Sequence, residues 1–384
     1  MAVLPTVTLG SLIWINLIMK YIFRKLFRSM MVVVFLTTAV FCQQNSTPKN
    51  IILLIGDGMG LNAVTASILS LENDQFKKFK SVGLSVTCSA DKLITDSAAG
   101  ATALATGYKT NNGKISQSTK GNDLKTLFEF AKGKDLSTGL IATISFTNAT
   151  PACFYAHNKS RHNEVEIAEQ FLNSGTDVAI SSGTQFLSTK LFDKIKNDSI
   201  TFLDSIKNRN YSYFGNYSEL QKNDSSNKIL ALFENYSLPK APERNYSLGD
   251  LTDIALNKLS QNKNGFVLMV EGSLIDKGAE GNDYNYMIGE VKDFNTAINA
   301  ALDFAEKDGN TLVVVTSDHE SGGFAIVGED KKNIDPRWAV LKSHTAAMVG
   351  IFSYGPGSEK FHGIMQNNEL GRILINYLEP DINW

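Results

Sequence analysis

The sequence has few cysteines and histidines and no surplus of charge of either sign. Its 384 residues include three cysteines and five histidines, and 37 Lys and Arg balance 39 Asp and Glu. Three cysteines do not make a disulfide framework, although a single Cys88–Cys153 bridge stays open. The net charge of −2 gives no basic footprint for nucleic acid as a specific partner. Any metal site with imidazole ligands must draw on a very short set of candidates.

The sequence also lacks a clean apolar run of the roughly 18 residues that a membrane span needs. Shorter apolar stretches occupy residues 7–19 and 30–42, with four basic residues between them and a polar exit after Cys42. A basic region, a short apolar run and a polar exit are typical of a signal peptide. We therefore predict that residues 1–42 are a signal peptide, with a signal anchor or a lipidated Cys42 as alternatives. The protein is then exported to the periplasm or beyond, and only this segment would contact a membrane.

Beyond this segment, apolar runs of strand length alternate with segments of helical periodicity. Runs that are apolar on both faces are typical of buried parallel strands. The alternation predicts one α/β domain over residues 43–384, with a central mostly parallel sheet and helices on both faces. The expected strands lie at residues 50–55, 82–86, 138–145, 178–180, 266–270, 311–316 and 348–352, and the expected helices at 64–71, 123–132, 164–172, 248–259, 286–306 and 369–378.

The composition changes between residues 190 and 246, where Asn, Ser, Lys and Tyr become frequent. Clusters of these polar residues favour loops and irregular structure. We expect residues 190–246 to form a peripheral insert that lies over the sheet, with one strand at residues 229–233. We interpret this insert as surface or as a contact between subunits.

Three of the predicted strands end in an acidic residue or are followed closely by one, namely Asp57, Glu271 and Asp318. The carboxyl ends of parallel strands meet at one edge of a sheet, where open α/β proteins bind their ligands. Carboxylates gathered at such an edge repel one another unless cations lie between them. The pattern therefore predicts a metal site at the carboxyl edge of the sheet.

A hydroxyl nucleophile candidate, Ser97, follows Asp96 and precedes a run of small residues at 98–103. Small residues allow a helix to begin with its backbone close to another group. A helix N-terminus offers unpaired N–H groups and the positive end of the helix dipole, which suits an anion. In isolation this stretch would indicate only an N-cap and a tightly packed helix. Beside a metal-binding edge, Ser97 is a candidate to attack a phosphorus atom.

Seven short motifs occur in order along the chain. They are Gly56-Asp57-Gly58-Met59-Gly60, Thr95-Asp96-Ser97-Ala98-Ala99-Gly100-Ala101-Thr102, Ala149-Thr150-Pro151-Ala152, Ser160-Arg161, Glu271-Gly272-Ser273-Leu274-Ile275-Asp276, Ser317-Asp318-His319-Glu320-Ser321-Gly322-Gly323 and Ser343-His344-Thr345. Their content and order resemble the alkaline phosphatases, particularly the compact bacterial type, from about residue 50 to the C-terminus. The resemblance implies hydrolysis of phosphate monoesters through a phosphoserine intermediate, two Zn²⁺ ions, one Mg²⁺ ion and a homodimer.

The resemblance also implies roles for single residues. Ser97 resembles the nucleophile, and Arg161 resembles the arginine that grips two phosphate oxygens with parallel hydrogen bonds. The implied metal ligands are Asp57, Asp318 and His319 for one zinc, Asp276 and His344 for the second zinc, and Thr150 and Glu271, with Asp57 shared, for magnesium. Mixed imidazole and carboxylate ligation is typical of zinc, whereas hydroxyl and carboxylate oxygens are typical of magnesium. Two zincs roughly 4 Å apart would clamp the attacking and leaving oxygens of an in-line displacement.

The chain departs from the family pattern at the second zinc. The family has a histidine four residues after the aspartate, whereas Glu280 stands at that distance from Asp276. We predict that Glu280 ligates zinc through oxygen, with lower affinity or another metal preference. The alternative is a solvated surface acid beside a degraded site. Asn148 and Lys277 are two further variable positions, expected to tune rate and pH dependence, and for Lys277 a water-mediated contact to phosphate is expected.

Two other functions stay open at this point. One is a phosphodiesterase or sulfatase of the same superfamily, and the other is a phosphate-binding protein with a degraded metal site. Ser97 with Arg161, and the third-metal pair of Thr150 and Glu271, favour monoester hydrolysis over the first alternative. The remaining histidines are interpreted as structural or exposed residues, and they are His157, His162 and His362.

Overall fold

The structure, a computed structural model, describes residues 14, 19–28, 47–193, 198–222, 228–328 and 334–384. The chain divides into two compact units, residues 1–46 and residues 47–384. In the first unit residues 19–28 are helical. The apolar run at residues 30–42, with Cys42, lies outside the described residues. Among the residues that are described, no helix has both the length and the apolar character that crossing a membrane requires.

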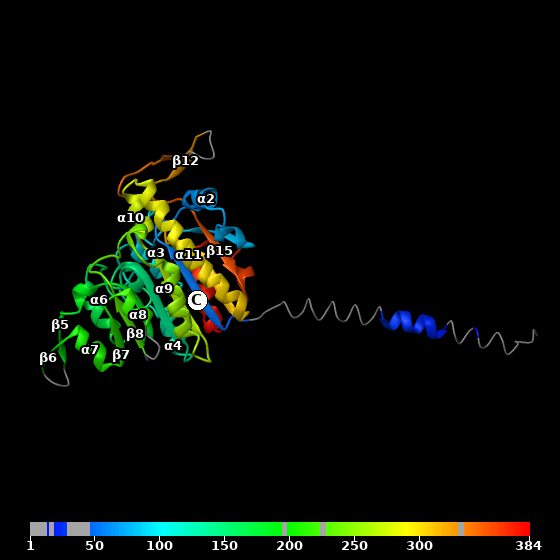
Figure 1. The fold of residues 1–384 in the computed structure, drawn as a ribbon, viewed down its shortest axis with the longest axis horizontal. Coiled ribbons are helices and arrows are strands. Elements are labelled where there is room, and N and C mark those ends of the chain that lie inside the picture. The colour runs from blue at the N-terminus through cyan, green and yellow to red at the C-terminus, as the bar shows by residue number, and fades with distance from the viewer. Residues whose placement is uncertain (1–13, 15–18, 29–46, 194–197, 223–227, 329–333) are drawn as a thin grey trace, which may run out of the picture. The chain divides into compact units, whose positions relative to one another are not determined.

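In the described part of the second unit, ten strands form one sheet, and its pairings are parallel apart from the two that β15 makes (Figure 1). This arrangement confirms the predicted mostly parallel α/β sheet. In spatial order the strands are β16 (Gly363–Gln366), β2 (Ser81–Val86), β15 (Val349–Tyr354), β10 (Thr311–Thr316), β1 (Asn50–Gly56), β9 (Phe266–Gly272), β3 (Ser137–Ser145), β4 (Val178–Ser182), β8 (Lys228–Leu232) and β7 (Tyr211–Phe214).

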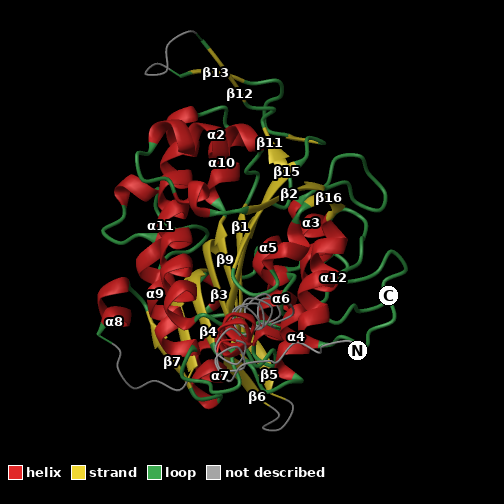
Figure 2. Cartoon of the chain, turned by 90° about the vertical axis from the view of Figure 1, so that its right-hand side faces the viewer, coloured by secondary structure: helices red, strands yellow, loops and turns green. Residues whose placement is uncertain are grey.

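Helices cover both faces of this sheet, and the central strand β1 shows why (Figure 2). Ile51, Leu53 and Ile55 belong to one apolar cluster, and Ile52 and Leu54 belong to another. Neighbouring residues of a strand face opposite sides, so a strand apolar at every position needs a layer on each side. The first cluster includes residues of α3 (Ser97–Thr106), α4 (Leu127–Lys132), α5 (Ala149–Ala152), α6 (Glu164–Phe171), α7 (Phe202–Asn208) and α12 (Asn367–Leu378). The second includes residues of α2 (Leu61–Ser70), α8 (Tyr217–Gln221), α9 (Leu248–Leu259), α10 (Leu274–Glu280) and α11 (Tyr284–Asp308).

The segment from residue 190 to residue 246 differs from its predicted placement over the sheet. Its strands β8 and β7 pair in parallel with β4 and with each other, so they extend the sheet at one edge. A separate ribbon of β5 (Lys190–Asp193) and β6 (Asp198–Thr201) precedes α7. The apolar residues of β8 are buried, and this burial explains why a strand forms inside an otherwise polar segment.

Some boundaries and short elements depart from the predicted ones for local reasons. Helix α4 begins at Leu127 and not at residue 123, because Thr126 and Glu129 form a capping box at its N-terminus. Two ribbons are too short for periodicity to indicate. They are β11 (Glu320–Ser321) with β14 (His344–Thr345), and β12 (Ala325–Val327) with β13 (Asp335–Arg337). Cys88 and Cys153 are free thiols, so the bridge that their spacing leaves open is not formed.

Candidate active site

The three strand-end acids meet at the carboxyl edge of the sheet. Strands β9, β1 and β10 are neighbours, and Ile55 of β1 lies opposite Glu271 on one side and Thr316 on the other. Asp57 and Asp318 follow these positions by two residues, so parallel pairing brings all three carboxylates to one place. Their exposed fractions are 5% for Asp57 and 0% for Glu271 and Asp318.

His319 connects these acids with the candidate nucleophile. Its Nε2 atom lies 3.3 Å from Asp57 Oδ1, 3.2 Å from Asp318 Oδ2 and 3.2 Å from Ser97 Oγ. Burial, together with the nearby His344 imidazole, lowers the pKa of His319 to about 3. The imidazole is therefore neutral, which is the form that ligates metal ions.

Ser97 owes its position to the start of α3. The carboxylate of Asp96 caps this helix by accepting a hydrogen bond of 2.9 Å from the backbone N–H of Ala99. One turn into the helix, a Cβ atom on Gly100 would lie 2.9 Å from the backbone oxygen of Asp318. The small residues therefore let the helix backbone approach the end of β10, as the sequence suggests.

Arg161 is held beside the same helix start. Its Nη1 atom lies 3.2 Å from Asp96 Oδ2, and its backbone N–H donates to the Gly113 carbonyl at 2.7 Å. The side chain keeps 22% of its surface exposed, so part of the guanidinium faces solvent near Ser97. The Asp96 contact is a positioning role that the sequence analysis missed, although Asp96 stands in the quoted motif.

Several buried oxygens at this edge have no hydrogen-bond partner among the described residues. They are Asp57 Oδ1, Asp318 Oδ2, both carboxylate oxygens of Glu271 and Thr150 Oγ1. Buried polar groups are normally paired, because an unpaired one loses the hydration of the unfolded state. Burial and the Asp318 carboxylate raise the pKa of Glu271 to about 8, and burial with the same neighbour also raises the pKa of Asp57. Oxygen donors left in this state fit a bound cation.

A second group of ligand candidates lies on the other side of His319. Asp276 is on α10, Glu280 follows it by one helical turn, and His344 is on β14. The Nε2 atom of His344 lies 3.7 Å from Asp276 Oδ1 and 3.6 Å from Glu280 Oε1. The His319 and His344 rings stack with centroids 3.5 Å apart. Within the described part of the chain, Asp57, Asp318 and His319 form one group that could hold a metal ion, and Asp276, His319 and His344 form another.

Two further residues contact this second group, namely Ser321, which the sequence analysis quotes only as part of a motif, and Lys277, for which it expects a water-mediated contact to phosphate. Ser321 Oγ donates a hydrogen bond of 2.5 Å to Asp276 Oδ1. Lys277 Nζ lies 3.1 Å from Asp276 Oδ2 and 2.8 Å from Glu280 Oε2. The His344 imidazole, 3.6 Å away, and the contact with Lys277 lower the pKa of Glu280 to about 2, in spite of its burial. Glu280 is thus an ionised carboxylate that faces both the imidazole and the lysine.

The remaining candidates lie apart from these groups. His157 contacts the Ser116 carbonyl at 3.0 Å and Glu129 Oε1 at 3.2 Å, and His162 and His362 are exposed. Asn148 caps the short helix α5, since its side chain accepts a hydrogen bond from the Ala149 backbone. This cap holds the turn that carries Thr150.

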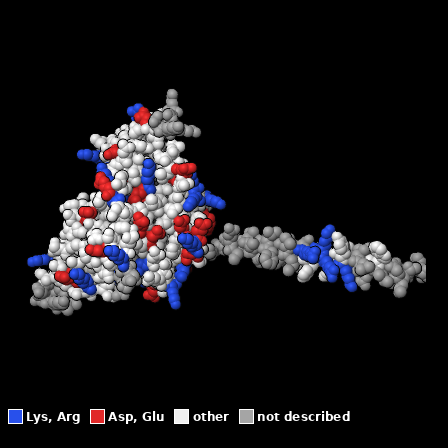
Figure 3. Space-filling view, in the orientation of Figure 1, with Lys and Arg blue, Asp and Glu red and all other residues white. Residues whose placement is uncertain are grey.

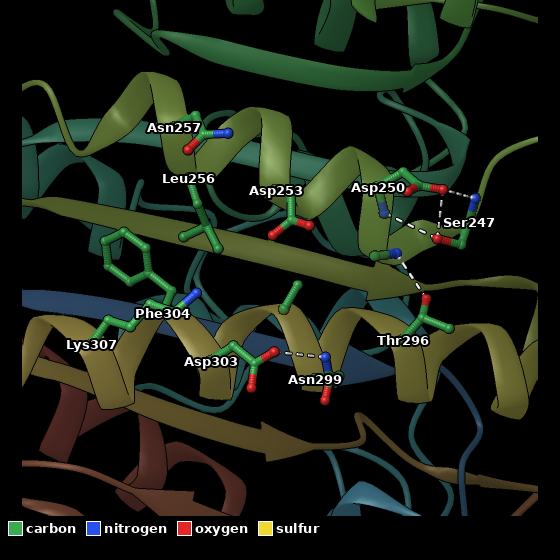
Figure 4. A pocket seen from close by; sticks show the side chains of 12 residues that line it. Ser247, Asp250, Asp253, Leu256, Asn257, Thr296, Asn299, Asp303, Phe304 and Lys307 are labelled. Carbon is green, nitrogen blue, oxygen red and sulfur yellow. Dashed lines mark hydrogen bonds between the residues drawn. The ribbon is translucent and has the colours of Figure 1, made fainter. Parts of the chain in front are cut away.

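Two surface hollows lie outside the acid cluster. One, of about 500 Å³, is lined by Glu320 and Thr345, which alternate with Ser321 and His344 along the β11–β14 ribbon and so face its other side. The other, of about 420 Å³, lies between α9 and α11 and includes none of the candidate site residues (Figure 4). Its acids Asp250 and Asp303 already pair with Ser247 and Asn299.

A sheet edge where buried acids and imidazoles surround the Ser97 hydroxyl is typical of a metal-dependent hydrolase. A sequence model described as alkaline phosphatase matches residues 48–342. Alkaline phosphatase 4 of Bacillus subtilis is 32% identical over 88% of this chain and 90% of its own length, and alkaline phosphatase of Escherichia coli is 33% identical over 84% of each chain. The structure of alkaline phosphatase from the Antarctic bacterium TAB5 matches with a TM-score of 0.81 and 36% identity, covering 88% of this chain and 99% of that one.

The chain belongs to the alkaline phosphatase family. The resemblance of the seven motifs is thereby confirmed, together with the enzyme class. The protein is a hydrolase of phosphate monoesters, and the phosphoserine intermediate is the general mechanism of its family. Divalent metal binding follows from the same membership and agrees with the two groups of ligand candidates.

Proposed function

We propose that Ser97 is the nucleophile of this phosphatase. The observation that carries the proposal is the 3.2 Å contact between Ser97 Oγ and the Nε2 atom of His319, a residue that also contacts two buried acids. In the first step Ser97 Oγ bonds to phosphorus, the ester P–O bond breaks, and the alcohol leaves with the proton. In the second step water attacks the phosphoserine, phosphate departs and the Ser97 hydroxyl is restored.

Arg161 and the start of α3 bind the phosphate in this proposal. The backbone N–H groups of the first turn and the positive end of the helix dipole suit an anion. A guanidinium can donate two parallel hydrogen bonds to non-bridging oxygens. Asp96 positions this guanidinium at 3.2 Å and caps the helix at the same time. The substrate phosphate is thus held beside Ser97 Oγ.

We propose two Zn²⁺ ions and one Mg²⁺ ion as the cofactors. Asp57, Asp318 and His319 would hold one zinc, and Asp276, Glu280 and His344 the other. Thr150 and Glu271, with Asp57 shared, would hold magnesium, and their unpaired buried oxygens support this assignment. Bound divalent ions supply Lewis acidity toward the attacking and leaving oxygens.

Glu280 is the least conventional ligand in this set. Its distance of 3.6 Å from His344 Nε2 and its ionised state support ligation through oxygen. Its contact with Lys277 supports the competing interpretation of a salt-bridged acid beside a weakened site. The proposal favours ligation, because Glu280 and Asp276 lie on one face of α10, toward the same imidazole.

The experiment that tests this function compares three nitrophenyl esters. The account predicts rapid hydrolysis of nitrophenyl phosphate and much slower hydrolysis of bis-nitrophenyl phosphate and nitrophenyl sulfate. Ser97→Ala should lower the rate on the monoester by about a thousandfold or more, since the nucleophile is lost. Faster hydrolysis of the diester or the sulfate would favour the superfamily alternatives. Phosphate binding without turnover under any added divalent metal would favour the binding protein.

We also propose that the protein is exported and that it forms a homodimer. The basic residues and the apolar run before Cys42 support export through a signal peptide or a signal anchor. The homodimer rests on the family resemblance alone. Cell fractionation with a C-terminal tag tests the first, and light scattering tests the second, with a mass of two chains expected.

A further inference from the structure

Lys277 lies among the ligand candidates of the second metal group. Its ammonium contacts Asp276 Oδ2 at 3.1 Å and Glu280 Oε2 at 2.8 Å. The lysine side chain is 47% exposed, whereas the Asp276 and Glu280 side chains are 4% and 26% exposed. The ammonium therefore bridges the two carboxylates from the side of the solvent.

The same carboxylates face His344 with their other oxygens. Asp276 Oδ1 and Glu280 Oε1 lie 3.7 Å and 3.6 Å from its Nε2 atom. A divalent ion bound between the His344 imidazole and these oxygens would therefore lie next to the ammonium of Lys277, which the same two carboxylates hold in place. If either carboxylate were to bind the ion with both oxygens, it would have to release Lys277.

The first metal group has no cation in such contact, and the more distant charge of Lys277 only partly offsets the rise in the pKa of Asp57 that burial and the Asp318 carboxylate cause. Among the described residues, Asp57 Oδ1 and Asp318 Oδ2 lack a hydrogen-bond partner, and the ion pairs found for these two acids are with His319. Carboxylates without a counter-charge attract a divalent ion more strongly than carboxylates that an ammonium already neutralises. The two groups thus differ in the charge that is left for a metal ion.

We propose that Lys277 is an internal counter-cation that weakens divalent-metal binding at the group of Asp276, Glu280 and His344. The group of Asp57, Asp318 and His319 then fills first, and the second position fills only at higher metal concentration. This inference rests on the proposed function, because it takes both groups to be metal positions. Lys277 is in this account a residue that sets metal affinity, not a ligand.

The test is a zinc titration of metal-free protein against a chromophoric chelator, which resolves the affinities of successive equivalents. Lys277→Met removes the charge and keeps an unbranched side chain. One unit charge within a few ångströms of a divalent ion changes its affinity by about tenfold even at a dielectric near that of water. The second equivalent should therefore bind about tenfold more tightly in this variant, and the first should tighten less, because Lys277 acts on Asp57 without contacting it.

Three further variants make the result specific. Lys277→Arg keeps the charge and should bind the second equivalent like the wild type. Lys292→Met removes an exposed lysine of α11 and controls for the loss of one surface charge. Asp318→Asn should weaken the first equivalent, which identifies the group that it occupies.

The possible outcomes distinguish a failure of the Lys277 proposal from a failure of the proposed function. A second equivalent that binds Lys277→Met no more tightly than the wild type overturns the counter-cation. Tightening by Lys277→Arg equal to that by Lys277→Met overturns it as well. A wild type that binds no zinc, or an Asp318→Asn variant that binds all equivalents normally, contradicts the proposed function itself.

Discussion

At the scale of the residue, one imidazole links the chemistry of the site. His319 Nε2 lies within 3.3 Å of two carboxylates and the Ser97 hydroxyl, and its ring stacks on His344. Its neutral state follows from burial, since a charged ring without water would be costly. The role of each surrounding residue therefore follows from the carboxylate, hydroxyl or imidazole that it places next to this ring.

Glu280 is the residue where this chain departs from its family, and replacing it gives a direct prediction. Glu280→His should raise zinc affinity at the second group or phosphatase activity, because imidazole suits zinc better than an oxygen held by Lys277. Metal analysis after dialysis, combined with a nitrophenyl phosphate assay, measures both. Two zincs held tightly by the native protein, with no change on substitution, would contradict the prediction.

Gly100 gives a prediction about close approach. A Cβ atom there would lie 2.9 Å from the Asp318 backbone oxygen, so Gly100→Ala must push α3 away from the end of β10. We expect a marked fall in kcat on nitrophenyl phosphate with the fold retained.

The matched control for this variant is Gly289→Ala on α11. Its nearest atoms outside the helix are 3.8 Å away, and alanine in a helix interior stabilises by up to about 1 kcal/mol over glycine. Full activity in both variants would show that the approach of α3 to Asp318 has no part in catalysis.

At the scale of the element, a side-chain pair joins α4 to the turn before α6. His157 Nε2 lies 3.2 Å from Glu129 Oε1, and Glu129 also completes the capping box of α4. Burial opposes charge on both groups. Their mutual hydrogen bond prevails, so it raises the pKa of His157 and lowers the pKa of Glu129.

This pair predicts a pH-dependent part of the stability. The contribution of His157 is fully present below its unfolded pKa of about 6.5 and is lost as pH rises through the raised folded value. Glu129→Gln keeps the capping box but removes the charge, so it should reduce stability more at about pH 6 than at about pH 9. Urea unfolding at the two pH values measures the difference. An equal loss at both would show that the ion pair contributes nothing.

Elements with a strong pattern are predictable from this sequence, and short ones are not. Helix α9 and strand β10 occupy the predicted residues 248–259 and 311–316, because burial imposes the helical period on one and continuous apolarity on the other. The ribbon of β11 and β14 escapes prediction, since two residues carry no period. It nevertheless brings His344 to Asp276.

The site could be predicted for the residues that strand topology gathers, and less well for those that pair locally. Asp57, Glu271 and Asp318 end neighbouring strands, so their meeting follows from parallel pairing. The contact of Lys277 with Glu280 is different. Residues three apart on a helix commonly pair on a solvated face, and the sequence does not reveal that this pair borders the partly buried imidazole of His344.

At the scale of the whole molecule, the structure combines an apolar core on both faces of the sheet with a cluster of buried acids at the carboxyl edge of the sheet. Charged residues of both signs are scattered over the face seen in Figure 3, with no large area of one sign on the folded unit. The buried acids, in contrast, have oxygens without partners among the residues that are described. Bound ions would therefore stabilise the fold as well as the reaction.

Metal removal gives the prediction at this scale. Treatment with a chelator should abolish activity and lower the thermal midpoint by several degrees, because buried carboxylates then repel one another. Added Zn²⁺ and Mg²⁺ should restore both, as measured by calorimetry and the ester assay. Asp318→Asn removes one of the charges, so its midpoint should fall less on chelation. A wild-type midpoint that chelation leaves unchanged would contradict the account.

The central claim is that the Ser97 hydroxyl receives the phosphoryl group at the carboxyl edge of the sheet. The most direct measurement is rapid acid quenching of metal-loaded enzyme during turnover of nitrophenyl phosphate, followed by peptide mass analysis. The account predicts a phosphate adduct on the peptide that contains Ser97, and its loss in Ser97→Ala. Turnover with the adduct on another residue, or undiminished turnover by Ser97→Ala, would contradict it.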